Sequence, residues 1–225
     1  LQQEASKVLN FSTQKTMRVA QQLYEGVDVK GSGTVGMITY LRTDSTRISD
    51  EADAAARAYI AGNYGEEYVS SSVQEKKTGK KIQDAHEAIR PTDITRTPFM
   101  MKESLTRDQF RLYQLIWKRF AASRMANAQY VTTSVKIDAA GYRFHVSASK
   151  RKFDGFMAVY VQEEEEKGEG NLLVKEISED TQLNFQAFDE KQHFTQPPAH
   201  YTEAALVKTL EELGIGRPST YAPTI

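Results

Sequence analysis

The chain has 225 residues, of which 40% are hydrophobic and 26% are charged, and its formal net charge is -1. These values are typical of a soluble globular protein that is long enough for one large domain or two small ones. The charge argues against a broad basic face for duplex DNA, the absence of cysteine excludes disulfides and thiolate zinc sites, and no apolar run is long enough to span a bilayer.

The N-terminal part predicts three helices. Leu1–Leu9 is a short one. Ser12 is a good N-cap for a second helix that ends at Gly26. Its core-facing residues are expected to be Met17, Ala20, Leu23 and Tyr24. Ser49 is the expected N-cap of a third, alanine-rich helix that runs to Tyr64, with acidic residues in its first turn.

Between the second and third helices, Met37–Ser45 predicts a strand or strand end, entered from a Gly/Ser turn at Lys30–Thr34. Because side chains alternate along a strand, Tyr40, Arg42 and Asp44 would share one face. A phenol has a pKa of about 10 and is a weak nucleophile, but an adjacent fixed cation favours phenolate and stabilises a phosphodiester under attack. The face therefore suits a tyrosine that becomes covalently linked to phosphate. A half-buried strand with a polar edge is the alternative.

A histidine motif follows a basic loop, Lys76–Lys81, whose charges are expected to be solvated, with contact to a DNA backbone as the alternative. His86 begins the run His-Glu-Ala-Ile-Arg. Arg90 stands where the second histidine of a zinc-protease motif would be, so the run is not that motif. Taken alone, the histidine is expected to be a surface or helix-cap residue.

The strongest helix signal begins at Thr106–Gln109, which is a capping box. Leu105 and Phe110 are placed as a hydrophobic staple around it. The helix that follows has an aromatic and aliphatic face, expected to lie in the core, formed by Tyr113, Ile116, Trp117 and Phe120.

From Ala128 the hydrophobic period changes from 3.6 to 2. Alternation over Val131–Ile137 and Tyr142–Val146, with a turn between them, predicts an antiparallel hairpin. Further strands are expected at Phe156–Val161 and Leu183–Phe188. The acidic run Glu163–Gly170 between them is expected to form a loop that repels DNA.

The C-terminal part predicts a linker at Pro197–Pro198 and then a helix that begins at Thr202 and ends at Gly214. Gly216–Tyr221 is expected to open another helix. A helix N-terminus with a free arginine and hydroxyls can receive a phosphate, while a plain helix connection is the alternative.

Three of these segments together resemble type IA DNA topoisomerases, in the form found in bacterial topoisomerase I. Gly36–Ser45 resembles the active-site tyrosine motif, Ala85–Thr92 resembles the histidine motif, and Gly214–Tyr221 resembles a DNA-contacting segment. The three occur in the family's order, and the resemblance covers essentially the whole chain.

The resemblance implies roles for individual residues. Tyr40 would be the nucleophile, Arg42 would stabilise charge beside it, and His86 would contact the scissile phosphate. Further contacts to single-stranded DNA would come from Asp44, Arg90, Thr202, Arg217 and Tyr221. Asp44 would also position Arg42 or a neighbour and relay a proton. His200 stands where an arginine is expected in much of the family, which weakens a backbone contact there.

The resemblance also implies the architecture and the reaction. The expected fold class is α+β: a mostly helical tyrosine-bearing domain at 1–126, part of a β-rich arch at 127–196, and part of a helical base at 197–225. The intact protein would relax negatively supercoiled DNA by transient single-strand cleavage through a 5′-phosphotyrosine, strand passage and religation, without ATP.

A further implication concerns what lies outside the chain. The family's Mg²⁺ is bound by an acidic cluster in an N-terminal toprim domain, and nothing here matches its Asp-x-Asp, so we expect no metal site in this chain. Both ends are expected to be internal to a longer protein, and the chain alone is expected to be inactive. Expected partners are single-stranded and negatively supercoiled DNA and the rest of the same polypeptide, in the bacterial cytoplasm at the nucleoid, without membrane association.

Two rival interpretations remain open. One is a non-catalytic DNA-binding module in which Tyr40 is structural. The other is a tyrosine nuclease or recombinase, although the histidine motif lacks the His-x-x-Arg spacing of tyrosine recombinases.

Overall fold

The structure is a computed structural model that describes residues 1–71, 86–161 and 180–225. The predicted basic loop at 76–81 and the predicted acidic loop at 163–170 lie outside these residues. The contacts divide the chain into two compact units. Unit 1 comprises Leu1–Asn127, Gly155–Tyr160 and Tyr201–Ile225, and unit 2 comprises Ala128–Asp154 and Val161–His200. The three-domain division expected from the sequence stays a prediction.

Unit 1 is mostly helical and contains one short antiparallel hairpin. Its helices are α1 (Gln2–Leu9), α2 (Thr13–Glu25), α3 (Asp50–Tyr64), α4 (Pro98–Met101), α5 (Arg107–Ser123), α7 (Glu203–Glu212) and α8 (Tyr221–Thr224), with 3₁₀ turns η1 (Glu66–Tyr68) and η2 (Gly155–Ala158). Its strands are β1 (Val27–Val29) and β2 (Gly33–Val35), paired antiparallel. Together with the hairpin of unit 2, this content confirms the expected α+β class.

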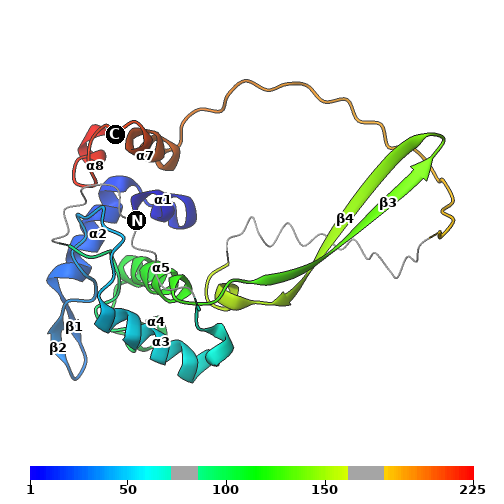
Figure 1. The fold of residues 1–225 in the computed structure, drawn as a ribbon. Helices are drawn as coiled ribbons and strands as arrows, with labels where there is room; N and C mark the ends of the chain where they lie inside the picture. The colour runs from blue at the N-terminus through cyan, green and yellow to red at the C-terminus, as the bar shows by residue number, and fades with distance from the viewer. Residues whose placement is uncertain (72–85, 162–179) are drawn as a thin grey trace. The chain divides into compact units, whose positions relative to one another are not determined.

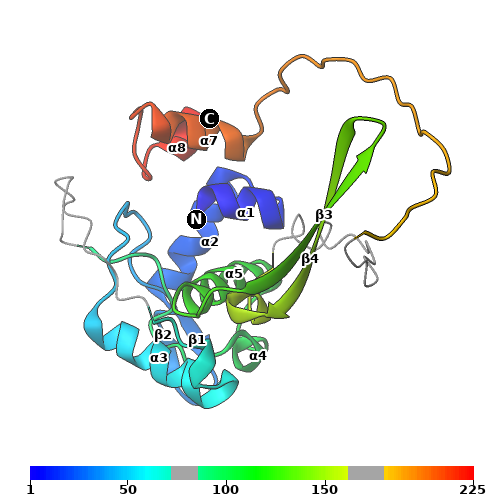
Figure 2. The same cartoon turned by 45° about the vertical axis from the view of Figure 1, so that its right-hand side comes forward.

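Helix α5 is the centre of unit 1. It packs against α1, α2 and α4 (Figure 1; Figure 2). Its predicted capping box is present, because the Thr106 side chain accepts from the Gln109 N–H while the Gln109 side chain accepts from the Thr106 N–H. The buried face confirms the predicted one and includes Leu112, Tyr113, Leu115, Ile116, Trp117 and Phe120.

The other predicted helix starts are also confirmed. Ser12, Ser49 and Thr202 each accept a hydrogen bond from a backbone N–H in the first turn of their helix. Helix α2 ends at Gly26, which has a φ of 123° that L side chains rarely adopt, and the chain there turns directly into β1. The prediction missed this hairpin, since its strands of three residues each are too short to show a period.

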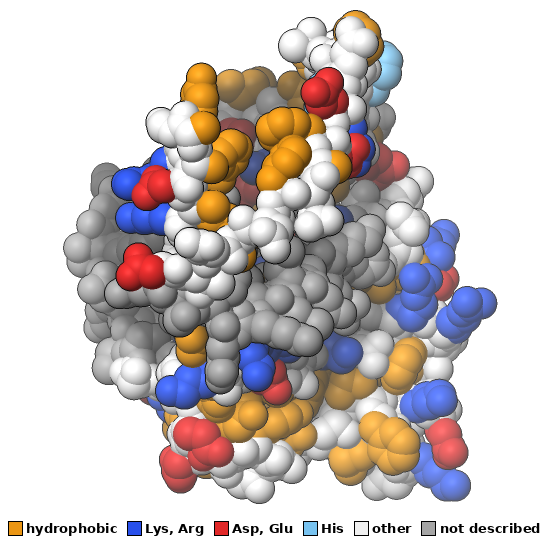
Figure 3. Space-filling view, turned by 90° about the vertical axis from the view of Figure 1, so that its right-hand side faces the viewer, with side chains coloured by type: hydrophobic (Ala, Val, Ile, Leu, Met, Phe, Trp, Pro, Cys, Tyr) orange, Lys and Arg blue, Asp and Glu red, His pale blue; other side chains and the backbone are white. Residues whose placement is uncertain are grey.

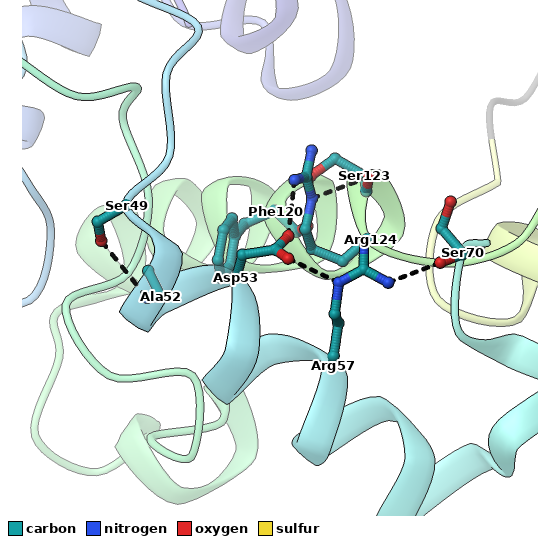
Figure 4. Close-up of polar contacts among 8 residues, drawn as sticks. All are labelled: Ser49, Ala52, Asp53, Arg57, Ser70, Phe120, Ser123 and Arg124. Carbon is teal, nitrogen blue, oxygen red and sulfur yellow. Dashed lines mark hydrogen bonds and ion pairs between the residues drawn. The ribbon is translucent and has the colours of Figure 1, made fainter. Parts of the chain in front are cut away.

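A charged network ties α3 to the end of α5 (Figure 4). The Asp53 carboxylate accepts from Arg57 at 2.6 Å and from Arg124 at 2.9 Å. Arg57 also donates to the Ser70 carbonyl at 2.6 Å, and the Ser70 N–H donates to the Arg124 carbonyl at 3.0 Å. Partial burial alone would raise the pKa of Asp53, but hydrogen bonds from Arg124 and Arg57 hold it below its ordinary value. The network therefore fixes the chain that follows η1 against the C-terminus of α5.

Unit 2 is built on one long antiparallel hairpin of β3 (Gln129–Ala139) and β4 (Tyr142–Phe153), which confirms the predicted one. Val135 pairs with Val146 and Ile137 pairs with Phe144, so apolar side chains share one face of the ribbon. Much of this face is exposed in unit 2 as described, with Phe144 51% accessible. Exposed hydrophobic side chains stand among charged ones on the face drawn in Figure 3.

Two predicted strands are wrong. Within Phe156–Val161 the chain forms the 3₁₀ turn η2, and Leu183–Phe188 has no regular secondary structure. Phe156–Val161 is a short apolar run and Leu183–Phe188 alternates apolar and polar residues, but neither segment has a partner strand among the described residues. A local pattern without a partner does not form a sheet.

Candidate active site

The tyrosine and histidine motifs are joined through their backbones. Ile38 forms an isolated antiparallel bridge with Pro91. The Thr39 N–H donates to the Arg90 carbonyl at 3.0 Å. The Thr39 hydroxyl donates to the Ala88 carbonyl at 2.8 Å and accepts from the Arg90 N–H at 3.0 Å. One threonine side chain thus connects two segments that are far apart in the sequence.

The predicted strand at Met37–Ser45 is wrong. Strand β2 ends at Val35, the only bridge in the segment is at Ile38, and the chain from Tyr40 to Ser49 has no regular secondary structure. The tyrosine segment and the histidine segment run side by side over only a few residues around the Ile38–Pro91 bridge, so no longer ladder forms.

The structure brings Tyr40 and His86 together. Their ring centroids are 4.8 Å apart with an interplanar angle of 35°. A second ring, that of Tyr24 at the end of α2, lies edge-on to Tyr40 at 5.6 Å and 72°. Tyr40 is half-buried, and its hydroxyl has no hydrogen-bond partner among residues 1–71, 86–161 and 180–225.

The side chains that follow Tyr40 alternate between core and solvent even without a strand. Leu41 and Ser45 are buried, while Arg42 and Asp44 are exposed. No ion pair or hydrogen bond engages the Arg42 guanidinium within the described part of the chain. A free guanidinium two residues from the tyrosine is suited to bind a phosphate.

Asp44 meets another predicted site residue, Arg217. The closest nitrogen–oxygen distance between them is 3.6 Å, and their side chains are 58% and 78% exposed. Such an exposed pair is weak, because water screens both charges. An incoming anion would therefore displace the carboxylate from Arg217 at little cost.

Arg90 is held inside its own motif. It pairs with Glu87 at 2.8 Å and donates to the Pro91 carbonyl at 3.0 Å, and its side chain is 14% exposed. Although partial burial alone would raise it, the pKa of Glu87 is held below its ordinary value by the Arg90 guanidinium. These contacts hold Arg90 within the histidine segment, so its side chain presents little surface to solvent.

The remaining predicted residues lie in the C-terminal segment of unit 1. Thr202 is exposed and its hydroxyl caps α7, accepting from the Ala205 N–H at 3.2 Å. Tyr221 is 7% exposed and lines a small cavity of about 120 Å³ together with Leu41 and Asp44. Burial raises the pKa of the Tyr221 phenol, so this side chain is neutral at physiological pH.

A larger cleft, of about 580 Å³, adjoins the tyrosine segment. It is lined by Thr43 to Thr46 together with charged side chains that include Glu4, Arg119 and Glu211. Tyr40, Arg42 and His86 line neither this cleft nor the smaller cavity. The three lie at the surface, an arrangement that fits a long polymer better than an enclosed small molecule.

The described residues do not fit a resident magnesium site. No group of three or more His, Cys, Asp or Glu side chains suited to a metal occurs in them. Asp44, the acid nearest in sequence to Tyr40, is paired with Arg217. A single carboxylate is insufficient to organise Mg²⁺ for phosphoryl chemistry.

Sequence reasoning missed two residues of the site. Tyr24 was expected in the core, but it is 39% exposed and contacts Tyr40. Thr39 has no distinctive local pattern, and its role emerges only from hydrogen bonds to a segment about 50 positions away. The one available signal for Tyr24 was its place in the last turn of an amphipathic helix, two residues before Gly26, where the helix ends.

Comparison with known proteins identifies the class of protein to which this site belongs. The profile of a family described as DNA topoisomerase matches residues 1–225. The chain therefore belongs to this DNA topoisomerase family.

Within the class, the chain is similar to bacterial topoisomerase I. A solved structure of full-length topoisomerase I from Thermotoga maritima is 41% identical and superposes with a TM-score of 0.74. The match covers 99% of this chain and 35% of that one, so the chain spans about a third of the length of that relative. None of the helices described here combines the length and apolar character that a membrane crossing requires.

Proposed function

We propose that this chain supplies the nucleophile of a type IA topoisomerase that relaxes negatively supercoiled DNA. The observation that carries the proposal is the half-buried Tyr40, whose ring lies against His86 at 4.8 Å and whose hydroxyl has no hydrogen-bond partner among the described residues. The Tyr40 oxygen attacks the scissile phosphorus, and the proton that the phenol loses is balanced by the proton that the departing 3′ oxygen takes up. The bond from phosphorus to the 3′ oxygen breaks, which leaves a free 3′ hydroxyl and a 5′-phosphotyrosine.

The proposed reaction needs no nucleotide cofactor as an energy source. One phosphodiester bond replaces another, so the energy of the cut bond is kept in the phosphotyrosine. After a second strand passes through the gap, the 3′ hydroxyl attacks the phosphotyrosine, restores the DNA and frees the Tyr40 oxygen. ATP independence follows from this exchange.

Arg42 and His86 stabilise the reacting phosphate in this proposal. Negative charge on the non-bridging oxygens grows as the phenol attacks, and the Arg42 guanidinium, which has no partner in the described part of the chain, is well suited to bind it. His86 touches the nucleophile's ring, so its imidazole is within reach of the same phosphate and can hold charge or pass a proton.

The other five predicted site residues differ in how directly they would contact the DNA strand. Arg217 and Thr202 are exposed and supply a cation and a hydroxyl. Asp44 pairs weakly with Arg217 and would give way to a phosphate. Arg90 and Tyr221 are mostly buried as described and would act chiefly by shaping the segments that carry the others.

The metal chemistry of the intact protein is proposed to lie elsewhere in the polypeptide. Because the donor set described here does not fit Mg²⁺, no step is assigned to a metal on this chain. A toprim domain outside the chain would bind Mg²⁺ and supply further charge stabilisation at the cleavage site. The chain alone is therefore proposed to be inactive, and its partners are single-stranded and supercoiled DNA and the remainder of its own polypeptide, in the bacterial cytoplasm.

The test is covalent capture of labelled single-stranded DNA by the intact protein with Mg²⁺, followed on a denaturing gel. Tyr40→Phe should abolish the adduct and preserve DNA binding, because it removes only the attacking oxygen. Tyr64→Phe, which removes a phenol oxygen from the far end of α3, serves as the matched control. An adduct that persists in Tyr40→Phe would exclude Tyr40 as the nucleophile.

A second arm compares this chain alone with a mixture of the chain and the separately supplied N-terminal portion. An adduct in the mixture only would support a nucleophile here and a metal site elsewhere. An adduct from the chain alone would contradict its proposed inactivity. DNA binding by the intact protein without any adduct would favour the alternative, a non-catalytic DNA-binding module with a structural Tyr40.

A further inference from the structure

A second tyrosine, Tyr24, lies beside the proposed nucleophile. Its ring meets the Tyr40 ring edge-on, with centroids 5.6 Å apart and planes at 72°. Edge-to-face packing at this separation is a favoured arrangement of aromatic rings. Tyr24 is 39% exposed, so burial in the hydrophobic core does not explain its position.

The backbones that carry the two tyrosines are also joined. The Met37 N–H donates to the Leu23 carbonyl at 2.7 Å. A Cβ at Gly36 would lie only 3.0 Å from the Tyr24 carbonyl oxygen, so glycine allows the close approach of the two segments. The last turn of α2 is therefore a fixed reference point for the chain that leads to Tyr40.

Hydrogen bonds between Thr39 and Arg90 fix the backbone just before Tyr40, but they do not set the rotamer of the phenol ring. The chain from Tyr40 to Ser49 has no regular secondary structure, and no strand of the described residues pairs with it. Attack on phosphorus requires the nucleophilic oxygen to be held in line and near contact distance. A ring packed edge-on against Tyr40 restricts its rotation without taking up its hydroxyl.

We propose that Tyr24 is a positioning residue that holds the Tyr40 ring in the orientation required for attack on the scissile phosphate. The inference rests on the proposed role of Tyr40 as nucleophile. The aromatic ring of Tyr24 is the active part, and its hydroxyl is dispensable.

The test uses the intact protein with a labelled single-stranded oligonucleotide and Mg²⁺, measuring the dissociation constant and the single-turnover cleavage rate at saturating DNA. Tyr24→Ala should lower the rate by up to about 100-fold, the cost of a nucleophile misplaced by roughly 1 Å. DNA affinity should stay unchanged. Tyr24→Phe keeps the ring and should restore the wild-type rate, whereas Tyr24→Leu keeps apolar bulk without the ring and should stay slow.

Tyr64→Ala is the matched control. It removes one ring from a comparable pair, that of Tyr64 and Tyr68 at 6.0 Å, at the far end of α3. It should cleave at the wild-type rate, and a defect as large as that of Tyr24→Ala would mean that general loss of stability explains both.

Three results would overturn the inference. A wild-type cleavage rate in both Tyr24→Ala and Tyr24→Leu would show that the contact does not position the nucleophile. Weakened DNA binding with an unchanged saturating rate would make Tyr24 a base-stacking surface instead. Equal defects in Tyr24→Phe and Tyr24→Ala would assign the effect to the hydroxyl. Loss of the adduct in Tyr40→Phe tests the proposed function separately, so failure of the Tyr24 inference and failure of the proposed function can be distinguished.

Discussion

Replacing Thr39 with valine tests the connection between the two motifs. Valine has nearly the same shape as threonine but no hydroxyl, so the Ala88 carbonyl and the Arg90 N–H each lose a partner that now lies at 2.8 and 3.0 Å. A buried polar group left without its partner costs about 1–3 kcal/mol. Because Thr39 is half-buried and water can reach part of the site, we expect about 2 kcal/mol of local destabilisation for the two groups together.

Amide hydrogen exchange measures this loss directly. A change of about 2 kcal/mol corresponds to a roughly 30-fold change in a local opening equilibrium, so the Arg90 amide should exchange faster by about that factor in Thr39→Val. Thr39→Ser is the matched control, since it keeps the hydroxyl and loses only a methyl group. In the intact protein, Thr39→Val should also slow formation of the DNA adduct, because His86 is carried by the segment that becomes loose.

The reasoning fails if the Arg90 amide exchanges at the same rate in Thr39→Val and the wild type. It also fails if Thr39→Ser is as loose as Thr39→Val, since the methyl group rather than the hydroxyl would then hold the segments together.

Two further substitutions test the framework of unit 1. Asp53→Asn should cost about 2 kcal/mol at pH 7, since charged hydrogen bonds to Arg124 and Arg57 are weakened. The pKa of Asp53 is depressed in the fold, so its stabilisation is complete above the ordinary carboxyl pKa and is lost as pH falls below about 4. Urea unfolding should show the gap between wild type and variant narrowing as pH falls below about 4, and a gap independent of pH would contradict this account. Tyr113→Phe leaves the Arg96 carbonyl without its 2.6 Å donor at a buried site and should cost about 1–2 kcal/mol at every pH from 5 to 9, whereas unchanged unfolding would mean that water replaces the hydroxyl.

The helices could be predicted because their signals are local. The hydroxyls at Ser12, Ser49, Thr106 and Thr202 each satisfy N–H groups of the turn that follows, which depends only on the next three residues. The hairpin of β3 and β4 was predictable for the same reason, since a tight turn joins strands with a long and clear alternation.

The failures share a different cause. A strand exists only if another segment supplies its partners, and neither Phe156–Val161 nor Tyr40–Ser45 has a partner strand in the described residues. Likewise, the contact of Tyr24 with Tyr40 depends on how α2 ends and where the next segment turns back. Residue type and spacing indicated which groups could form a site, but the contacts that orient them are long-range and have no periodic signature.

The link between Thr39 and Ala88 joins positions 49 apart in the chain. Closing a loop of that length costs roughly 3 kcal/mol of chain entropy, which only the completed packing of unit 1 offsets. During synthesis from the N-terminus, Tyr40 therefore emerges well before the segment that supplies its histidine neighbour. An incompletely synthesised or unfolded chain contains the tyrosine but lacks the assembled site. The proposed capacity for cutting DNA therefore forms only when unit 1 folds, and unfolding of unit 1 removes it.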